Sequence, residues 1–131
     1  MSAIDYEEAI GRFDGDEEIY LELIETFLDS PIADFSALRV ELAAGDVKQV
    51  AFRAHKLKGA ALTLGGNKLA GIAGTLETAL RERFPEEILS ARKTGALKPG
   101  EYCANVDELE SIYRETVAEL RSIQNAIQTR R

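Results

Sequence analysis

The sequence contains one cysteine, one histidine, three prolines and no tryptophan among its 131 residues. The single Cys103 excludes an internal disulfide, and one cysteine with one histidine cannot form a Cys/His metal cluster of recognisable spacing. The sequence also lacks a long hydrophobic run and an N-terminal basic stretch followed by a hydrophobic one. We therefore expect neither a membrane span nor a signal peptide, and we predict the cytoplasm as the compartment.

Basic residues are fewer than acidic ones. The chain has 16 Lys and Arg against 23 Asp and Glu, which gives a formal net charge of −7 at pH 7. Binding to nucleic acid or to an anionic membrane surface depends on clustered basic residues, so neither partner is expected. Partner proteins fit better. The length, with 45% hydrophobic and 30% charged residues, predicts one compact domain over residues 1–131.

Apolar residues recur at helical spacing from one end of the chain to the other, and no segment alternates apolar and polar residues as a half-buried strand does. We therefore predict an all-α fold. A capping-box pattern at Asp5 and Glu8 predicts a short accessory helix that ends near Phe13. Asp16 is expected to cap a longer helix that ends at Ser30.

Pro31 follows at once and fits the first position of a helix capped by Ser30, although a kinked continuation of the preceding helix is equally compatible. This element is expected to end at Gly45. Asp46 with Gln49 forms another capping-box-like pattern. The sequence therefore predicts a further helix that begins just after Asp46.

That helix is expected to end at Gly65, and Asn67 can restart the chain in the opposite direction, which predicts a tight helical hairpin. Residues 85–104 are predicted to form a loop or short-helix insertion, and mobility is expected in the loop over residues 94–100. Asn105 with Glu108 predicts the start of the last helix. Packed on their apolar stripes, the long helices form a bundle.

The hairpin turn at Gly65 and Gly66 allows a distance estimate. His55 precedes the turn by about ten residues and Glu77 follows it by about eleven, and each helical residue rises ~1.5 Å. Both residues therefore lie roughly 15 Å from the turn. We expect them side by side, each on the flank of its helix's apolar stripe and within reach of water.

This arrangement suits nucleophilic chemistry. A carboxylate at Glu77 would accept one imidazole N–H, fix the tautomer of His55 and leave the other nitrogen's lone pair as a nucleophile. Lys58, at i+3 from the histidine, places an ammonium near a transferring phosphoryl group. Gly59 is unfavourable inside a helix by about 1 kcal/mol, and the absent side chain would leave space for another protein's backbone.

Other residues near His55 predict a docking surface. Phe52 and Leu62 lie on the same flank and offer apolar contacts to a partner, although Leu62 also fits a core position. Basic residues form a predicted local patch on an otherwise acidic chain: Lys48, Arg53, Lys56 and Lys68.

The hairpin and the residues before it contain one continuous pattern: an acidic helix start, H-x-L-K-G, L-G and a closing L-E. Its residues are Asp46, the AHKLKGAA segment over 54–61, Leu64-Gly65-Gly66, Leu69 and Leu76-Glu77. In type and spacing this pattern resembles the histidine phosphotransfer (HPt) domain family. The resemblance covers about residues 16–83, followed by a terminal helix.

The resemblance implies an antiparallel, up-down-up-down four-helix bundle with a short accessory N-terminal helix, and a core bundle over about residues 16–127. By resemblance, His55 is the phosphorylated nucleophile, Lys58 the charge stabiliser, Gly59 the clearance residue for docking and Glu77 the imidazole partner. The position of Glu77 is often Gln in the family.

The resemblance also implies partners: response-regulator receiver domains and a sensor histidine kinase. The phosphoryl group would pass between receiver aspartates through His55, or from a kinase to a receiver, so the chain is a carrier and not an enzyme. No intrinsic cofactor is expected, and Mg²⁺ is expected to belong to the receiver. The predicted partner contacts are Phe52, Arg53, Lys56 and Leu62.

Two other classes stay open. One is an HPt-like interaction module that docks receivers or kinases without being phosphorylated. The other is a hydrolase that uses His55 and Glu77 as a base pair, although no nucleophile, metal set or oxyanion site accompanies them. A nucleotide-binding loop is not expected, because Gly71 and Gly74 lack a preceding strand and a Walker lysine. These two glycines are compatible with close helix packing.

Overall fold

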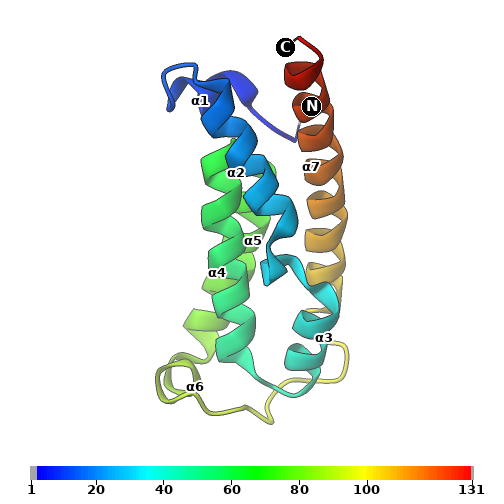
Figure 1. Ribbon diagram of the computed structural model, residues 1–131. Helices are drawn as coiled ribbons and strands as arrows, with labels where there is room; N and C mark the ends of the chain where they lie inside the picture. Colours follow the sequence, from blue (N-terminus) through cyan, green and yellow to red (C-terminus); the bar gives the residue numbers. More distant parts are fainter. Residues whose placement is uncertain (1–2, 131) are drawn as a thin grey trace.

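The computed structural model describes residues 3–130, except for the side chain of Ile32 (Figure 1). All regular elements in this span are helical, which confirms the all-α prediction. The elements are α1 (Tyr6–Gly11), α2 (Glu17–Asp29), the 3-10 helix η1 (Pro31–Ala33), α3 (Phe35–Ala43), α4 (Val47–Leu64), α5 (Asn67–Arg83), α6 (Pro85–Ser90) and α7 (Cys103–Thr129).

Aspartate side chains cap the first helices of the chain. Asp5, Asp16, Asp34 and Asp46 stand directly before α1, α2, α3 and α4, and each carboxylate accepts a backbone N–H of the first turn. Such acceptors satisfy N–H groups that have no partner within the helix. The starts predicted from Asp5, Asp16 and Asp46 are therefore confirmed.

The helix predicted to open at Pro31 begins later. Pro31 opens only the short η1, and α3 starts at Phe35. The cap is Asp34, whose carboxylate accepts the N–H of Ala37 at 3.0 Å. The prediction of Ser30 as this cap was wrong because the stronger acceptor stands four residues further along the chain.

Two further predicted caps were also misplaced. Asn67 is the first residue of α5, and Gly66 precedes it without any side-chain cap. α7 begins at Cys103 because Tyr102, with a left-handed φ of +67°, turns the chain into the helix. Asn105 therefore lies inside the first turn of α7 and does not cap it.

Figure 1 shows α2, α4, α5 and α7 lying lengthwise beside one another, with α3 toward the lower end. α4 and α5 form the predicted antiparallel hairpin. Gly65 ends α4 with a φ of +82°, and a Cβ at this position would lie 2.5 Å from the carbonyl oxygen of Asp5. Both the left-handed backbone and the close approach require glycine here. α7 packs along α5, α2 and α3.

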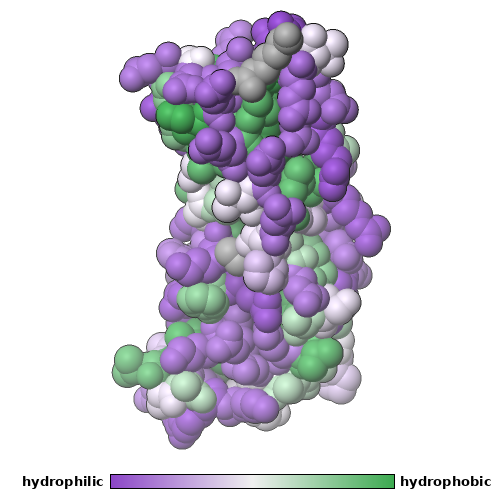
Figure 2. All heavy atoms as spheres, viewed as in Figure 1, coloured by the Kyte–Doolittle hydropathy of each residue, from purple (hydrophilic) through white to green (hydrophobic). Residues whose placement is uncertain are grey.

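The centre of the bundle is filled by fully buried apolar side chains. The largest include Tyr20, Ile24, Leu38, Leu64, Leu69, Leu76, Leu80, Leu109, Leu120 and Ile127. Each such aliphatic side chain stabilises the fold by roughly 1.5–3 kcal/mol relative to exposure. Figure 2 shows a mainly hydrophilic outer face with separate apolar patches, as expected when the apolar stripes face inward.

The N-terminal segment holds the end of α4. The Asp5 N–H donates to the Gly65 carbonyl at 2.8 Å, and the Tyr20 hydroxyl donates to the Leu64 carbonyl at 2.7 Å. The guanidinium of Arg12 donates to the Leu62 carbonyl. These donors satisfy carbonyls that the last turn of a helix leaves without partners. The accessory helix α1 therefore helps to fix the hairpin that carries the site.

The segment 85–104 contains α6 and a loop that is tied to the bundle at several points. The Thr94 N–H donates to the Gly45 carbonyl at 2.9 Å. Arg83 donates to Glu101 and to the Tyr102 hydroxyl, and its guanidinium carbon lies 4.8 Å from the centre of the Phe84 ring. These contacts join the segment to the bundle, and the mobility of the loop over residues 94–100 stays a prediction.

Candidate functional site

The one histidine of the chain lies near the middle of α4, with 56% of its side chain exposed. Its Nδ1 atom lies 2.9 Å from Oε2 of Glu77 on α5, so the predicted juxtaposition of His55 and Glu77 is present. An ionised carboxylate only accepts hydrogen bonds, so it favours the tautomer with the proton on Nδ1. The lone pair then resides on Nε2, and more than half of the His55 side chain is exposed to solvent.

Glu77 is buried, with 9% of its side chain exposed, and it faces several positive groups. Besides His55, the Nε of Arg81 donates to its Oε2 at 2.8 Å, and the Nζ of Lys58 lies 3.9 Å from its Oε1. Lys58 and Arg81 together outweigh one carboxylate. The surroundings of His55 therefore carry a local positive charge that favours an incoming phosphoryl group.

Sequence reasoning missed Arg81, although it identified Glu77. The available signal was spacing, because a residue at i+4 from Glu77 lies one turn further on the same face of α5. The side chain of Arg81 is 46% exposed, so its guanidinium both holds Glu77 and reaches solvent. We therefore add Arg81 to the candidate site.

The antiparallel register of the hairpin explains which residues meet. His55 on α4 lies opposite Glu77 on α5. One helical turn closer to the Gly65-Gly66 connection, Lys58 lies opposite Gly74. His55 and Lys58 are an i, i+3 pair, as are Gly74 and Glu77, so each pair shares one helix face. The four residues form a compact group across the two helices.

Gly59 faces open space. A Cβ built at this position would meet no atom within 4 Å outside the local helix backbone, in the part of the chain that the structure describes. Packing within the domain therefore does not require glycine here. This is compatible with the predicted clearance for another protein, which remains a proposal.

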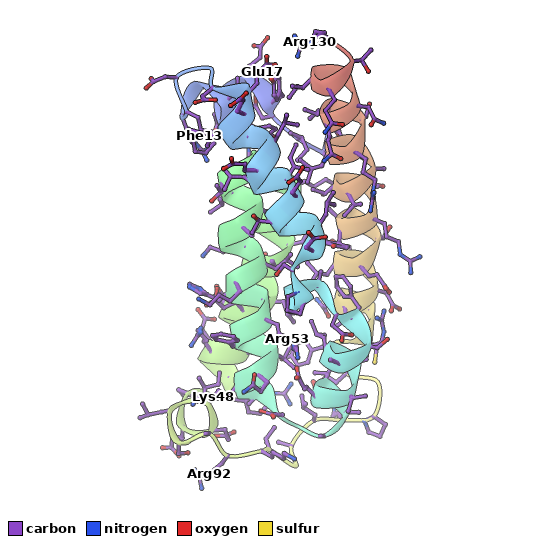
Figure 3. All side chains as sticks on the ribbon, viewed as in Figure 1. Phe13, Glu17, Lys48, Arg53, Arg92 and Arg130 are labelled. Atoms are coloured by element: carbon purple, nitrogen blue, oxygen red, sulfur yellow. The ribbon has the colours of Figure 1, made fainter. Side chains whose placement is uncertain are left out.

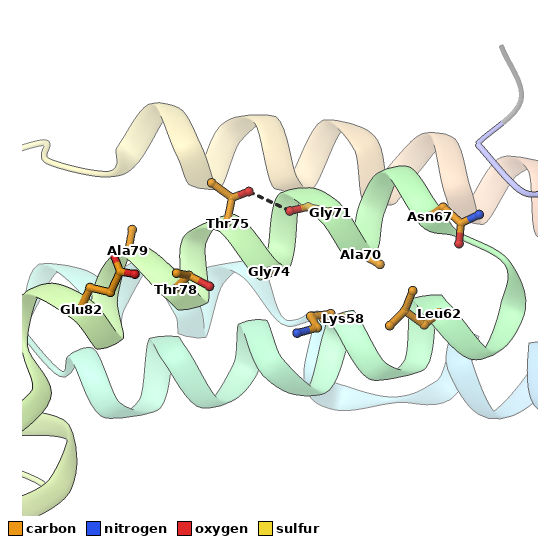
Figure 4. Close-up of a pocket in the computed structure, with 10 residues that line it drawn as sticks. All are labelled: Lys58, Leu62, Asn67, Ala70, Gly71, Gly74, Thr75, Thr78, Ala79 and Glu82. Carbon is orange, nitrogen blue, oxygen red and sulfur yellow. Dashed lines mark hydrogen bonds between the residues drawn. The ribbon is translucent and has the colours of Figure 1, made fainter.

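An open groove lies beside the site, between α4 and α5 (Figure 4). Its lining residues are Lys58, Leu62, Asn67, Ala70, Gly71, Gly74, Thr75, Thr78, Ala79 and Glu82. Figure 4 shows Lys58 on α4 reaching into the space opposite the turn of α5 that carries Gly74. Most of the α5 residues along the groove have small side chains, so the groove is shallow on the α5 side.

Three of the predicted partner contacts are exposed. Phe52 is 50% exposed and Leu62 is 39% exposed. The Nζ of Lys56 lies 5.4 Å from the centre of the Phe52 ring, a cation–π contact that orients both side chains on the outside of α4. Exposed aromatic and aliphatic side chains around a reactive histidine offer apolar contact area to a partner.

Arg53 does not belong to this surface. Its guanidinium donates two hydrogen bonds to Glu41 of α3, at 2.7 and 2.9 Å, and Figure 3 shows it between α4 and α3. Two residues along a helix turn the side chain by roughly 200° from His55, so Arg53 points away from the histidine. Its role as a partner contact stays a prediction. Lys68 lies at the start of α5, close to the hairpin connection, and pairs with Glu115 of α7. It therefore does not join the basic residues near His55. Lys48 is exposed on α4.

Comparison with known proteins assigns the family. The sequence model of the Hpt domain matches residues 22–123, which is most of the chain. The protein therefore belongs to the Hpt domain family, whose members are phosphotransfer carriers in two-component signalling. No curated protein and no solved structure matches the chain at a significant level.

Among residues 3–130, none of the helices combines the length and the hydrophobicity that a membrane crossing needs. Nor do three or more metal-ligating His, Cys, Asp or Glu side chains gather in one place there. Family members interact with receiver domains and with histidine kinases, which are protein partners.

Proposed function

We propose that the protein is a phosphocarrier in which His55 accepts a phosphoryl group from the aspartyl phosphate of one receiver domain, or from a kinase, and passes it to another receiver. The observation that carries the proposal is the exposed imidazole of His55 with Nδ1 2.9 Å from a buried carboxylate. This geometry reserves Nε2 for reaction while the ring stays accessible.

Phosphoryl transfer exchanges an O–P bond for an N–P bond. The Nε2 lone pair of His55 attacks the phosphorus, the bond between phosphorus and the donor aspartate oxygen breaks, and the aspartate leaves as a carboxylate. The new N–P bond makes the imidazole ring cationic while the proton stays on Nδ1. Glu77 stabilises that cation because its carboxylate lies beside Nδ1. Transfer to the next aspartate reverses the same bonds.

The neighbouring residues complete the proposal. Lys58 places an ammonium on the same side of α4, where it stabilises negative charge on the phosphoryl oxygens. Gly59 leaves space for the backbone of the docking receiver. Phe52, Lys56 and Leu62 supply contacts around the histidine. The partner's Mg²⁺ belongs to the receiver, and the chain itself needs no cofactor for this role.

We further propose that α2 with α3, α4, α5 and α7 are the legs of an antiparallel, up-down-up-down four-helix bundle, the first leg being split at η1. The chain acts as a substrate of its partners in the cytoplasm. A rigid bundle suits this role, because a carrier must present one histidine in the same way to a donor and to an acceptor.

A transfer assay tests the proposal. Wild type and His55→Gln are incubated with a receiver phosphorylated on its aspartate and Mg²⁺, and the label is followed. We expect label on wild type that is labile in acid and stable in base, and none on His55→Gln. Equal labelling of both proteins would overturn the assignment to His55. Receiver binding by an unlabelled wild type would instead favour a docking module.

A further inference from the structure

We infer that Gly74 is a positioning residue for Lys58: the absent side chain at this place in α5 forms a seat for the Lys58 stem and directs its ammonium toward Glu77. The inference rests on the proposed function, because it assigns a residue that prepares the charge stabiliser for transfer. Gly74 itself touches neither the imidazole nor the transferring group.

The contact is specific to one side chain. A Cβ at Gly74 would lie 3.2 Å from Cδ and 4.0 Å from Cε of Lys58. Leaving aside the local helix backbone, it meets no other described atom within 4 Å. At 3.2 Å the lysine stem must give way. The space that a side chain at position 74 would fill is therefore next to the Lys58 stem alone.

Close helix packing does not explain this glycine. A Cβ at Gly66 would lie 3.3 Å from the carbonyl oxygen of Ala61, so backbone approach matters there. At Gly74 the neighbouring atoms belong to the stem of a flexible side chain and not to the α4 backbone. Glycine is unfavourable inside a helix relative to alanine, so its presence at position 74 needs another cause. Free passage for the Lys58 stem supplies one.

The seat at Gly74 lies beside the part of the Lys58 side chain that extends toward the Glu77 carboxylate. Gly74 and Glu77 share one face of α5, three residues apart, and the Lys58 ammonium lies 3.9 Å from Glu77 Oε1. The Lys58 side chain is 41% exposed, so burial does not hold it in place. When the Lys58 stem lies against Gly74, its ammonium stays next to the Glu77 carboxylate, which faces His55. A side chain there would lift the stem toward solvent.

Gly71 provides a matched control. It lies three residues earlier on the same helix, lines the same groove, and a Cβ there would meet no described atom within 4 Å beyond the local helix backbone. Leucine at either position improves helix propensity equally. Only at position 74 does it occupy the path of the lysine stem. A difference between the two variants therefore reports on Lys58 and not on helix stability or groove shape.

The experiment compares Gly74→Leu with Gly71→Leu in the full chain, each with Lys58 and with Lys58→Met. Transfer rates are measured at saturating phosphorylated receiver. We expect Gly74→Leu to slow transfer by about fivefold, since small misplacements of catalytic groups have such effects, and Gly71→Leu by less than about twofold. In the Lys58→Met background, Gly74→Leu should cause no further loss. An equal loss in both backgrounds, or no loss in either, would overturn the inference.

A second readout does not depend on transfer. In the NMR spectrum, the Cδ and Cε resonances of Lys58 should shift in Gly74→Leu and stay in place in Gly71→Leu. Unshifted resonances in Gly74→Leu would contradict the seat. Should Gly74→Leu fail to fold, Gly74→Ala carries the same test with a smaller expected shift. If wild type takes no phosphoryl group, the proposed function fails, while the resonances still decide whether Gly74 seats Lys58.

Discussion

The imidazole of His55 and the carboxylate of Glu77 face each other across the α4–α5 hairpin, with 2.9 Å between Nδ1 and Oε2. The carboxylate is almost fully buried while the imidazole is more than half exposed. One partner is therefore fixed by the bundle and the other is presented to solvent. This asymmetry suits a carrier, because the reactive ring keeps its tautomer and orientation without losing access to a protein donor.

The first prediction concerns Glu77. Glu77→Ala removes the group beside Nδ1, so transfer to His55 should slow by about tenfold, equivalent to about 1.4 kcal/mol in the barrier. Glu77→Gln keeps an oxygen acceptor and should stay within about threefold of wild type. Single-turnover transfer from a phosphorylated receiver measures both. The exposed Glu82→Ala on the same helix is the control, and a loss of rate there equal to that of Glu77→Ala would refute the assignment.

The second prediction concerns Arg81, which shares Oε2 of Glu77 with His55. Arg81→Ala frees the carboxylate to change rotamer, so transfer should slow by a few fold, less than in Glu77→Ala. Stability should fall by ~1 kcal/mol, more than for an exposed i, i+4 pair, because Arg81 is half-exposed but Glu77 is buried. Arg114→Ala breaks a similar pair with Glu110 on α7 and should leave transfer unchanged. Equal rates for the two variants would argue against a role for Arg81.

The third prediction separates docking from chemistry at Gly59. Gly59→Leu points into open space and improves helix propensity by up to ~1 kcal/mol, so unfolding by urea should need no less denaturant than in wild type. Transfer from a phosphorylated receiver should fall at least about tenfold, since the side chain blocks close approach. Phosphorylation by phosphoramidate, which needs no docking, should persist. Parallel loss with both donors would mean that the substitution damages His55 itself.

The fourth prediction concerns the anchor of the 85–104 segment. Gly45 has a φ of +74°, and a Cβ there would lie only 2.0 Å from the carbonyl oxygen of Thr94. Gly45→Ala should therefore lower the free energy of unfolding by more than about 1 kcal/mol. Gly95→Ala in the same loop meets no described atom within 4 Å and is the control. Equal shifts of the urea unfolding curves for both variants would contradict a stabilising role for the contact between Gly45 and Thr94.

The sequence alone predicted the hairpin well because its signals are local. The cap at Asp46 and the left-handed glycine at Gly65 mark the two ends of α4, and helical rise then places His55 opposite Glu77. Rotation about the helix axis decides which side chains share a surface, just as rise decides which lie at the same level. Arg53 was predicted on the histidine surface, yet it lies two positions before His55, and this rotation turns its side chain toward Glu41.

Other features could not be predicted because distant contacts determine them. The Thr94 backbone bond to Gly45 and the Arg83 contacts with Tyr102 join parts of the chain that have no local pattern in common. The same holds for the start of α7, where the left-handed Tyr102 overrides the capping pattern at Asn105. Local cap preferences amount to about 1 kcal/mol, so tertiary contacts readily displace them.

The most direct test of the account is to determine which ring nitrogen of His55 carries the phosphoryl group. Wild-type protein with ¹⁵N-labelled histidine is phosphorylated by a receiver, and the coupling between phosphorus and nitrogen is read by NMR. We expect the phosphoryl group on Nε2, with the proton on Nδ1 beside Glu77. A phosphoryl group on Nδ1, or on any other residue, would contradict it.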